Sequence, residues 1–223
     1  MKKGLILAGG SIDDTFVLHY MEHRSFDEII AVDGALETAK RLSLEPTQII
    51  GDFDTVSQET LQQFQRESSA KWVRLVPEKD ATDMEMALDK AMEAGCSEIA
   101  ILGALGGRMD HELANIHLLY KAKQQGVRCE ILDRQNRITV LTESTVLSKK
   151  ELFGAYISFI SLTTQVSGLT LKGFKYPLNG YCLTIGTSLG VSNELSMEEG
   201  QVIFEDGVLL CLETKDASGE VKA

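Results

Sequence analysis

The spacing of apolar residues changes once along this 223-residue chain, and that change most constrains its fold. Up to about residue 135, unalternating apolar runs such as GLILAG, EIIAVD and EIAILG are separated by amphipathic stretches such as residues 34–44 and 57–67. Apolar runs of this kind between helices are typical of a parallel sheet covered on both faces. The sequence therefore predicts an α/β domain over residues 1–136.

After about Arg137 the helical periodicity fades, and Thr, Ser and Gly become more frequent. Two dipeptides typical of β-hairpin turns occur here. Asn179-Gly180 lies between GFKYPL and YCLTIG, and Asp206-Gly207 lies between QVIFE and VLLCL. We expect a small antiparallel β domain over residues 137–223, packed against the first domain because no Pro-rich linker separates them.

Charge and composition exclude several classes of function. With 22 Lys and Arg against 33 Asp and Glu, the net charge of −11 repels phosphate backbones, so we expect no nucleic-acid partner. An anionic ligand would need a metal ion to help hold it. The four cysteines show no CxxC pairing, which indicates reduced thiols and a cytoplasmic location. No segment approaches the roughly 20 apolar residues of a membrane helix, so we expect no membrane association.

Five groups of chemically distinctive residues each follow a different predicted strand. In an open parallel sheet the carboxyl ends of all strands lie along one edge, and ligands bind in the crevice there. The five groups are therefore predicted to form one site. They are Gly9-Gly10, Asp33-Gly34, Asp52 with Asp54, the stretch Lys79, Asp80, Thr82 and Asp83, and the stretch Gly106, Gly107, Arg108, Asp110 and His111.

Some of these residues also have an ordinary structural explanation. Thr82 and Glu85 form a capping box that could simply begin a helix, and Asp83 would be favoured in the first turn of that helix. Ser57 is a good N-cap for the helix that follows it, so Asp52 and Asp54 are not needed as caps. Taken singly, several motifs are compatible with a structural role, but their common position at one predicted edge favours a site.

The residue types in this predicted site indicate a particular chemistry. Asp52 and Asp54 would leave the same face of an extended chain and converge. Carboxylate oxygens are hard ligands that suit Mg²⁺. Glycine-rich turns at helix N-termini let backbone N–H groups approach phosphate, and Arg108 can bind phosphate with two donors. The combination predicts Mg²⁺-nucleotide phosphoryl or pyrophosphoryl transfer, in a chain that lacks the GxxxxGK[ST] and GxGxxG motifs.

Five segments of the chain, taken in order, resemble the thiamine pyrophosphokinase family. They are AVDGA, IIGDFDTV, PEKDATDMEMAL, ILGALGGRMDHELANIHLL and GTSLGVSNEL. The resemblance implies a Rossmann-like three-layer ATP-binding domain, a C-terminal β-sandwich thiamine-binding domain, and a homodimer with the substrate site at the subunit interface. It also implies Mg²⁺-dependent transfer of a pyrophosphoryl group from ATP to the thiamine hydroxyl, which gives thiamine diphosphate and AMP.

Position within these motifs implies a role for individual residues. The metal-binding acids would be Asp52, Asp54 and Asp83, and the catalytic set would add Arg108 and Asp110. The nucleotide-binding residues would be Asp33, Gly34, Lys79, Asp80, Thr82, Gly106, Gly107, Arg108 and His111. The thiamine-binding residues would be Ser188, Ser192 and Asn193. Two carboxylates, Asp83 and Asp110, are candidates to accept the hydroxyl proton.

Two departures and two alternatives accompany this interpretation. Ala35 stands where many family members have a second glycine, and the only tryptophan, Trp72, lies outside the C-terminal domain, so the stacking partner of thiamine is not named. One alternative is a pyrophosphokinase for another alcohol, such as a hydroxymethylpterin, which would not need the GVSNEL domain. The other is a non-catalytic module that senses nucleotide or thiamine, which would not need the acids.

Overall fold

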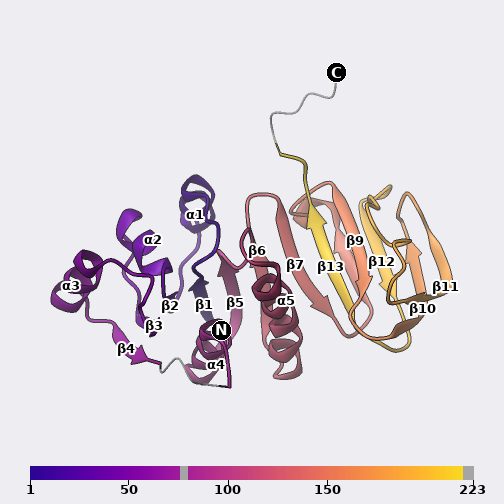
Figure 1. Cartoon of the computed structure of the whole chain (residues 1–223). Helices are drawn as coiled ribbons and strands as arrows, with labels where there is room; N and C mark the ends of the chain where they lie inside the picture. The colour runs from indigo at the N-terminus through magenta and orange to yellow at the C-terminus, as the bar shows by residue number, and fades with distance from the viewer. Residues whose placement is uncertain (76–79, 218–223) are drawn as a thin grey trace. The chain divides into compact units, whose positions relative to one another are not determined.

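A computed structural model describes residues 1–75 and 80–217, and the chain divides into two compact units, Met1–Arg134 and Gln135–Ala223. The first unit alternates strands with helices, as Figure 1 shows in indigo to magenta. Its elements are β1 (Lys2–Leu7), α1 (Asp14–Met21), β2 (Glu28–Val32), α2 (Ala35–Arg41), β3 (Gln48–Gly51), α3 (Gln58–Glu67), β4 (Lys71–Arg74), α4 (Asp83–Glu93), β5 (Cys96–Leu102), α5 (Met109–Gln124) and β6 (Arg128–Leu132).

The strands of the first unit form the predicted parallel sheet. Their order is β4-β3-β2-β1-β5-β6, and every neighbouring pair is parallel. Strand β1 is central, and its residues from Leu5 to Leu7 are completely buried. The chain moves from β1 toward β4 and then returns to β5 on the other side of β1. Ligands bind open α/β sheets at such a reversal, so the crevice outside β1 and β5 is the expected site.

The helices pack on this sheet through small and apolar side chains. Helix α4 contacts strands β1, β2, β3 and β5 and lies against α5, and helix α2 contacts β2 and α3. The buried face of α4 carries Met84, Ala87, Leu88 and Ala91, which recur at helical spacing. No helix within residues 1–75 and 80–217 is long and apolar enough to cross a membrane.

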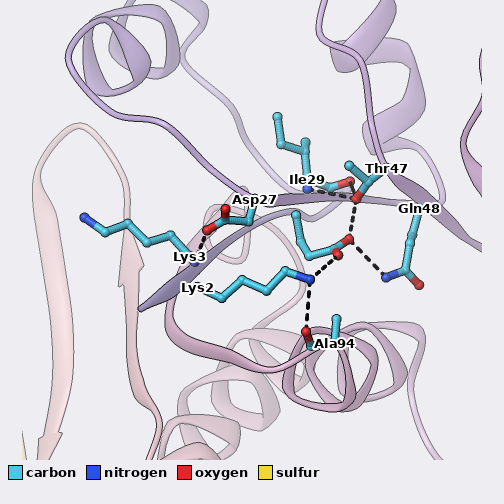
Figure 2. A network of polar contacts seen from close by, with 8 residues as sticks. Lys2, Lys3, Asp27, Ile29, Thr47, Gln48 and Ala94 are labelled. Atoms are coloured by element: carbon cyan, nitrogen blue, oxygen red, sulfur yellow. Dashed lines mark hydrogen bonds and ion pairs between the residues drawn. The ribbon is translucent and has the colours of Figure 1, made fainter.

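A polar network fixes the amino-terminal end of this sheet, at the edge opposite the predicted site (Figure 2). Lys2 Nζ donates to Glu28 Oε1 at 2.9 Å and to the carbonyl oxygen of Ala94 at 3.0 Å. Glu28 Oε2 accepts from Thr47 Oγ1 at 2.6 Å and from Gln48 Nε2 at 3.3 Å. The network thus links the starts of β1, β2 and β3 to the end of α4.

The second unit is built from antiparallel strands, as predicted. One set has the order β7-β13-β9, and a separate four-stranded sheet has the order β11-β10-β12-β8. Phe159 and Phe174 pack edge to face in its apolar core, with ring centroids 5.7 Å apart. The elements are β7 (Asn136–Leu141), β8 (Thr145–Ser148), the 3₁₀ turn η1 (Lys149–Glu151), β9 (Tyr156–Ser161), β10 (Gln165–Lys172), β11 (Leu178–Thr184), β12 (Glu199–Ile203) and β13 (Leu209–Thr214).

The hairpin turn predicted at Asn179-Gly180 is wrong. Both residues lie inside strand β11, where the register against β10 shifts. Gly180 takes a left-handed φ of +60°, and its amide donates to Thr170 Oγ1 at 2.9 Å. An irregularity of this kind needs the same permissive glycine as a tight turn, so the dipeptide does not distinguish the two.

The hairpin predicted at Asp206-Gly207 is also wrong. These residues connect β12 to β13, but β12 pairs with β10 and β8, whereas β13 pairs with β7 and β9. Gly207 has a φ of +108°, and a Cβ atom there would lie 2.6 Å from the carbonyl oxygen of Gln165. The glycine is therefore required by a close backbone approach where the chain passes between two sheets.

Candidate active site

Three glycine-containing loops meet at the carboxyl edge of the parallel sheet. A Cβ atom at Gly10 would lie 2.4 Å from the carbonyl oxygen of Gly103, so the loops after β1 and β5 approach too closely for any side chain. A Cβ atom at Gly106 would lie 2.5 Å from Ser11 Cβ, and one at Gly9 would lie 3.7 Å from the Gly34 amide nitrogen. The structure therefore brings the motifs after β1, β2 and β5 together, as the sequence predicts.

The loop after β3, residues 52–56, carries Asp52 and Asp54, and we call it the acidic loop. Asp52 is half-buried, Asp54 is exposed, and Phe53 between them is buried against Trp72 with ring centroids 5.2 Å apart. The expectation that this stretch is extended is wrong, because Phe53 has a left-handed φ of +65°. This conformation is unusual for a non-glycine residue, so the surrounding contacts must hold it.

Asp33 supplies one of those contacts. It also has a left-handed φ, +46°, and its Oδ1 accepts a hydrogen bond from the Phe53 amide at 3.1 Å. A Cβ atom at Gly51 would lie 1.9 Å from that same Oδ1, so any other residue at position 51 would displace the carboxylate. Glycine at position 51 and aspartate at position 33 therefore depend on each other.

The carboxylates of Asp33, Asp52 and Asp83 come together from three different segments. Burial, a hydrogen bond with Asp83, and repulsion by Asp83 and Asp52 raise the pKa of Asp33 from 3.8 to about 7, although the Phe53 amide favours its ionised form. Three carboxylates this close repel one another unless a proton or a cation is present. The carboxyl group of Asp33 is therefore strongly perturbed by its two acidic neighbours.

The raised pKa predicts how the stability of the metal-free protein depends on pH. Between pH 3.8 and about 7 the folded state keeps a proton on Asp33, whereas the unfolded chain releases it. The free energy of unfolding therefore decreases as pH rises through this window. Asp33→Asn keeps an acceptor for the Phe53 amide and cannot ionise. Urea unfolding in EDTA measures the free energy of unfolding of the variant minus that of the parent. This difference should increase from pH 5 to pH 8. A difference that stays constant would contradict the raised pKa of Asp33.

Arg108 and Asp110 form an exposed ion pair at the start of α5. Arg108 Nε and Nη2 donate to the two carboxylate oxygens of Asp110 at 3.1 and 2.6 Å, and the His111 amide donates to Asp110 Oδ1 at 3.0 Å. The guanidinium group lowers the pKa of Asp110 below its usual range. The pair holds the guanidinium group in one orientation while Nη1 takes no part in the pair.

Two side chains of α5 that the sequence analysis did not single out hold the glycine loop, residues 103–108. Buried Asn115 donates from Nδ2 to the carbonyl oxygen of Ala104 at 3.0 Å, and Glu112 Oε1 accepts from the Gly107 amide at 2.7 Å. The sequence does carry a signal for Asn115, because it is a polar residue one helical turn before Leu119, on the buried face of α5. The Gly107 amide, predicted to approach phosphate, thus already has an acceptor in this structure.

The remaining predicted residues of the first unit lie around these groups. Thr82 caps α4 by accepting from the Glu85 amide at 3.2 Å, so its structural role is confirmed. Asp80 and His111 are exposed. Lys79 lies outside the described residues. Within residues 1–75 and 80–217, no group of three or more His, Cys, Asp or Glu side chains is arranged to hold a metal ion.

The three residues predicted to bind thiamine lie in the second unit. Ser188 and Ser192 are exposed, and Ser192 has a left-handed φ of +57°. Asn193 is buried, and its side chain is engaged within the unit: Nδ2 donates to the carbonyl oxygen of Tyr176 at 2.8 Å, and Oδ1 accepts from the amides of Tyr176 and Glu194 at 3.0 and 2.9 Å. Asn193 therefore orders the surrounding loops.

Comparison with protein families gives two matches that follow the division of the chain. Residues 19–131 match the catalytic domain of thiamin pyrophosphokinase, and residues 143–209 match the vitamin B1 binding domain of the same family. The chain is 36% identical over 187 residues to thiamine pyrophosphokinase of Bacillus subtilis (strain 168), an alignment that covers 84% of this chain and 87% of the relative.

Solved structures agree with these matches. Thiamine pyrophosphokinase from Bacillus subtilis superposes with a TM-score of 0.86 at 34% identity, and the superposition covers 97% of this chain and 100% of that one. The enzyme from Geobacillus thermodenitrificans gives a TM-score of 0.83 at 32% identity, with 97% and 99% covered.

Proposed function

Because the chain belongs to the thiamine pyrophosphokinase family and so transfers a pyrophosphoryl group from ATP to thiamine, we propose that the carboxyl edge of its parallel sheet is the site of that transfer. The observation that carries the proposal is the convergence of Asp33, Asp52 and Asp83 beside the glycine loops. Neither a hydroxymethylpterin pyrophosphokinase nor a non-catalytic sensor is favoured, given the family matches to both units.

The donor chemistry at this edge suits Mg²⁺, although no three His, Cys, Asp or Glu side chains of residues 1–75 and 80–217 are arranged to hold a metal ion in this structure. Asp52, Asp54 and Asp83 offer only carboxylate oxygens, and the raised pKa of Asp33 indicates that the cluster carries more negative charge than it can hold without a proton or cation. We assign Asp52, Asp54 and Asp83 as the metal ligands. When bound, Mg²⁺ would neutralise charge on the phosphates of ATP and orient them.

The residues of the chain bind and orient the two substrates. The thiamine hydroxyl oxygen forms a bond to the β-phosphorus while the bond from that phosphorus to the bridging oxygen of AMP breaks. Arg108 binds phosphate oxygens with its planar guanidinium group, which Asp110 holds in place. We assign Asp33, Gly34 and the glycine loop to the nucleotide pocket, and we retain Lys79, Asp80, Thr82 and His111 as nucleotide-binding residues.

The hydroxyl proton needs an acceptor, and two carboxylates were candidates. Arg108 lowers the pKa of Asp110, which makes Asp110 a poor base. Asp83 hydrogen-bonds with Asp33 in the acid cluster, whereas Arg108 pairs with Asp110. Asp83 therefore remains the candidate acceptor that the Arg108 guanidinium group does not oppose.

We assign residues 1–136 to a Rossmann-like, three-layer ATP-binding domain and residues 137–223 to a β-sandwich that binds thiamine. The topological switch at β1 and the antiparallel sheets support these assignments. All four cysteines are free, which is compatible with a cytoplasmic location. The surface around Ser188 and Ser192 includes exposed apolar side chains, namely Tyr176, Ile185, Leu189 and Val191.

We further propose that the enzyme is a homodimer in which the thiamine-binding surface of one subunit completes the acid edge of its partner. Exposed apolar side chains on a soluble domain mark interaction or ligand surfaces, and an amphipathic cation such as thiamine needs an enclosed cleft. Subunit mixing tests this arrangement. One parent carries Asp54→Asn and the other carries Ser188→Trp, which places a large side chain on the exposed thiamine surface.

Each parent should be folded and nearly inactive. If the site is composite, each mixed dimer contains one site with both defects and one with neither. Random exchange of equal amounts makes about half of the dimers mixed, so activity should return to about a quarter of that of the unaltered enzyme. If mixed dimers are verified by mass spectrometry and stay inactive, the whole site lies within one chain.

A further inference from the structure

The acidic loop is held at both of its ends by side chains from one short segment. At the first end Asp33 accepts from the Phe53 amide. At the second end Glu37, in the first turn of α2, accepts from the Ser57 amide with Oε1 at 2.8 Å and from Thr60 Oγ1 with Oε2 at 2.7 Å. Asp33 and Glu37 are four residues apart, so the start of α2 fixes both the entry and the exit of the loop.

The contact of Glu37 is integrated with the start of α3. Ser57 caps this helix: its Oγ accepts from the Thr60 amide at 3.2 Å and donates to Thr60 Oγ1 at 3.0 Å. Thr60 is completely buried. Both carboxylate oxygens of Glu37 therefore have donors, one from the backbone at the end of the loop and one from a buried hydroxyl in the following helix.

Few polar contacts hold the loop between these two anchors, although the buried side chains of Phe53 and Val56 pack in the apolar core. Within it the Asp54 amide donates to Asp52 Oδ1 at 3.2 Å, and the Val56 amide donates to the Phe53 carbonyl oxygen at 3.4 Å. Both contacts are long, and Phe53 has an unfavourable left-handed conformation. Asp52 and Asp54 themselves do not enter that core, so the placement of their carboxylates depends on the backbone that Asp33 and Glu37 hold at the loop ends.

We propose that Glu37 is a positioning residue for pyrophosphoryl transfer, which acts by anchoring the acidic loop so that Asp52 and Asp54 keep their places at the site. The inference rests on the proposed role of those two acids. Hydrogen bonds from Ser57 and Thr60 lower the pKa of Glu37 despite its partial burial, so the carboxylate is ionised when it accepts them. A charged acceptor makes the stronger anchor.

A purely structural role is the competing explanation, because Glu37 also links α2 to α3. The chain offers a matched control for that role. Lys40 Nζ and Glu59 Oε1, 2.7 Å apart, join the same two helices through an exposed ion pair that does not touch the loop. Glu59→Gln breaks this second link, whereas Glu37→Ala breaks the first link and releases the loop.

The test compares Glu37→Ala, Glu37→Gln and Glu59→Gln with the unaltered chain. Loss of a residue that orients metal ligands typically costs about 10- to 100-fold in metal affinity or activity, so Glu37→Ala should weaken Mn²⁺ binding, measured by electron paramagnetic resonance, by about tenfold or more. Its kcat/KM for MgATP should fall by a similar factor. Amide hydrogen exchange over residues 52–57 should become faster. Glu59→Gln should leave all three unchanged.

Glu37→Gln keeps an acceptor for the Ser57 amide, so it should lose less Mn²⁺ affinity and less activity than Glu37→Ala. If urea unfolding shows that the alanine variant is poorly folded, the glutamine variant provides the test. The proposal is overturned if Mn²⁺ affinity is unchanged in a folded Glu37→Ala protein, or if Glu59→Gln causes equal losses. If the unaltered chain were active without a metal ion, the proposed function itself would be contradicted. The failure of the proposal about Glu37 and the failure of the proposed function can therefore be told apart.

Discussion

Asp54→Asn is expected to reduce kcat/KM by about a thousandfold, which corresponds to about 4 kcal/mol of lost transition-state stabilisation at a metal site. The substitution keeps the size of the side chain but replaces a hard anionic ligand with a neutral amide. Asp54 is exposed and contributes nothing to the apolar core, so the free energy of unfolding should change little. Steady-state kinetics and urea unfolding of the same preparation measure both quantities.

The matched control is Asp89→Asn. Asp89 lies on α4 and pairs with Lys121 at 2.7 Å, and it has no assigned role in catalysis. The same chemical change there should leave kcat/KM within about twofold, because this half-buried pair touches no residue assigned to the site. Near-normal activity in a folded Asp54→Asn protein would remove the metal-binding role of the acidic loop.

Arg108→Lys is expected to reduce kcat by about a hundredfold, comparable to the loss of one preorganised donor to a developing anion. Lysine keeps the positive charge but cannot reproduce the planar fork that Arg108 presents. It also cannot make the two parallel contacts to Asp110 that orient the group. The loss should therefore appear mainly in kcat, measured at saturating MgATP and thiamine.

Arg41 provides the control for this substitution. It makes an equivalent two-point contact to Asp14, with Nε–Oδ2 and Nη2–Oδ1 distances of 2.6 and 2.7 Å, in the same unit but with no assigned role in the site. Arg41→Lys should leave kcat unchanged. If Arg108→Lys is also fully active, the site requires only a positive charge at this position.

Periodicity and glycine position predicted the architecture well because they reflect local physics. The unalternating apolar runs became the buried strands of a parallel sheet, and Ser57 and Thr82 cap the predicted helices. The two hairpin predictions failed for a physical reason. Gly180 and Gly207 do adopt left-handed conformations, but an irregular strand and a crossing between sheets need this freedom as much as a turn does.

The residue types of the site could be predicted from the sequence, whereas their supports could not. Motif position at strand ends was enough to bring Asp33, Asp52 and Asp83 to one edge. The contacts of Glu37 with Ser57 and of Glu112 with Gly107 depend on side-chain direction and loop conformation. A glutamate in the first turn of a helix carries no local signal for such contacts. Only the three-dimensional arrangement identifies them.

Product analysis tests the central claim most directly. The purified chain is incubated with ATP and thiamine, with Mg²⁺ and separately with EDTA, and the nucleotides and thiamine esters are resolved by chromatography. Attack at the β-phosphorus predicts equal amounts of AMP and thiamine diphosphate, formed only when Mg²⁺ is present. Formation of ADP and thiamine monophosphate would contradict pyrophosphoryl transfer, and undiminished turnover in EDTA would contradict the metal site at the acid edge.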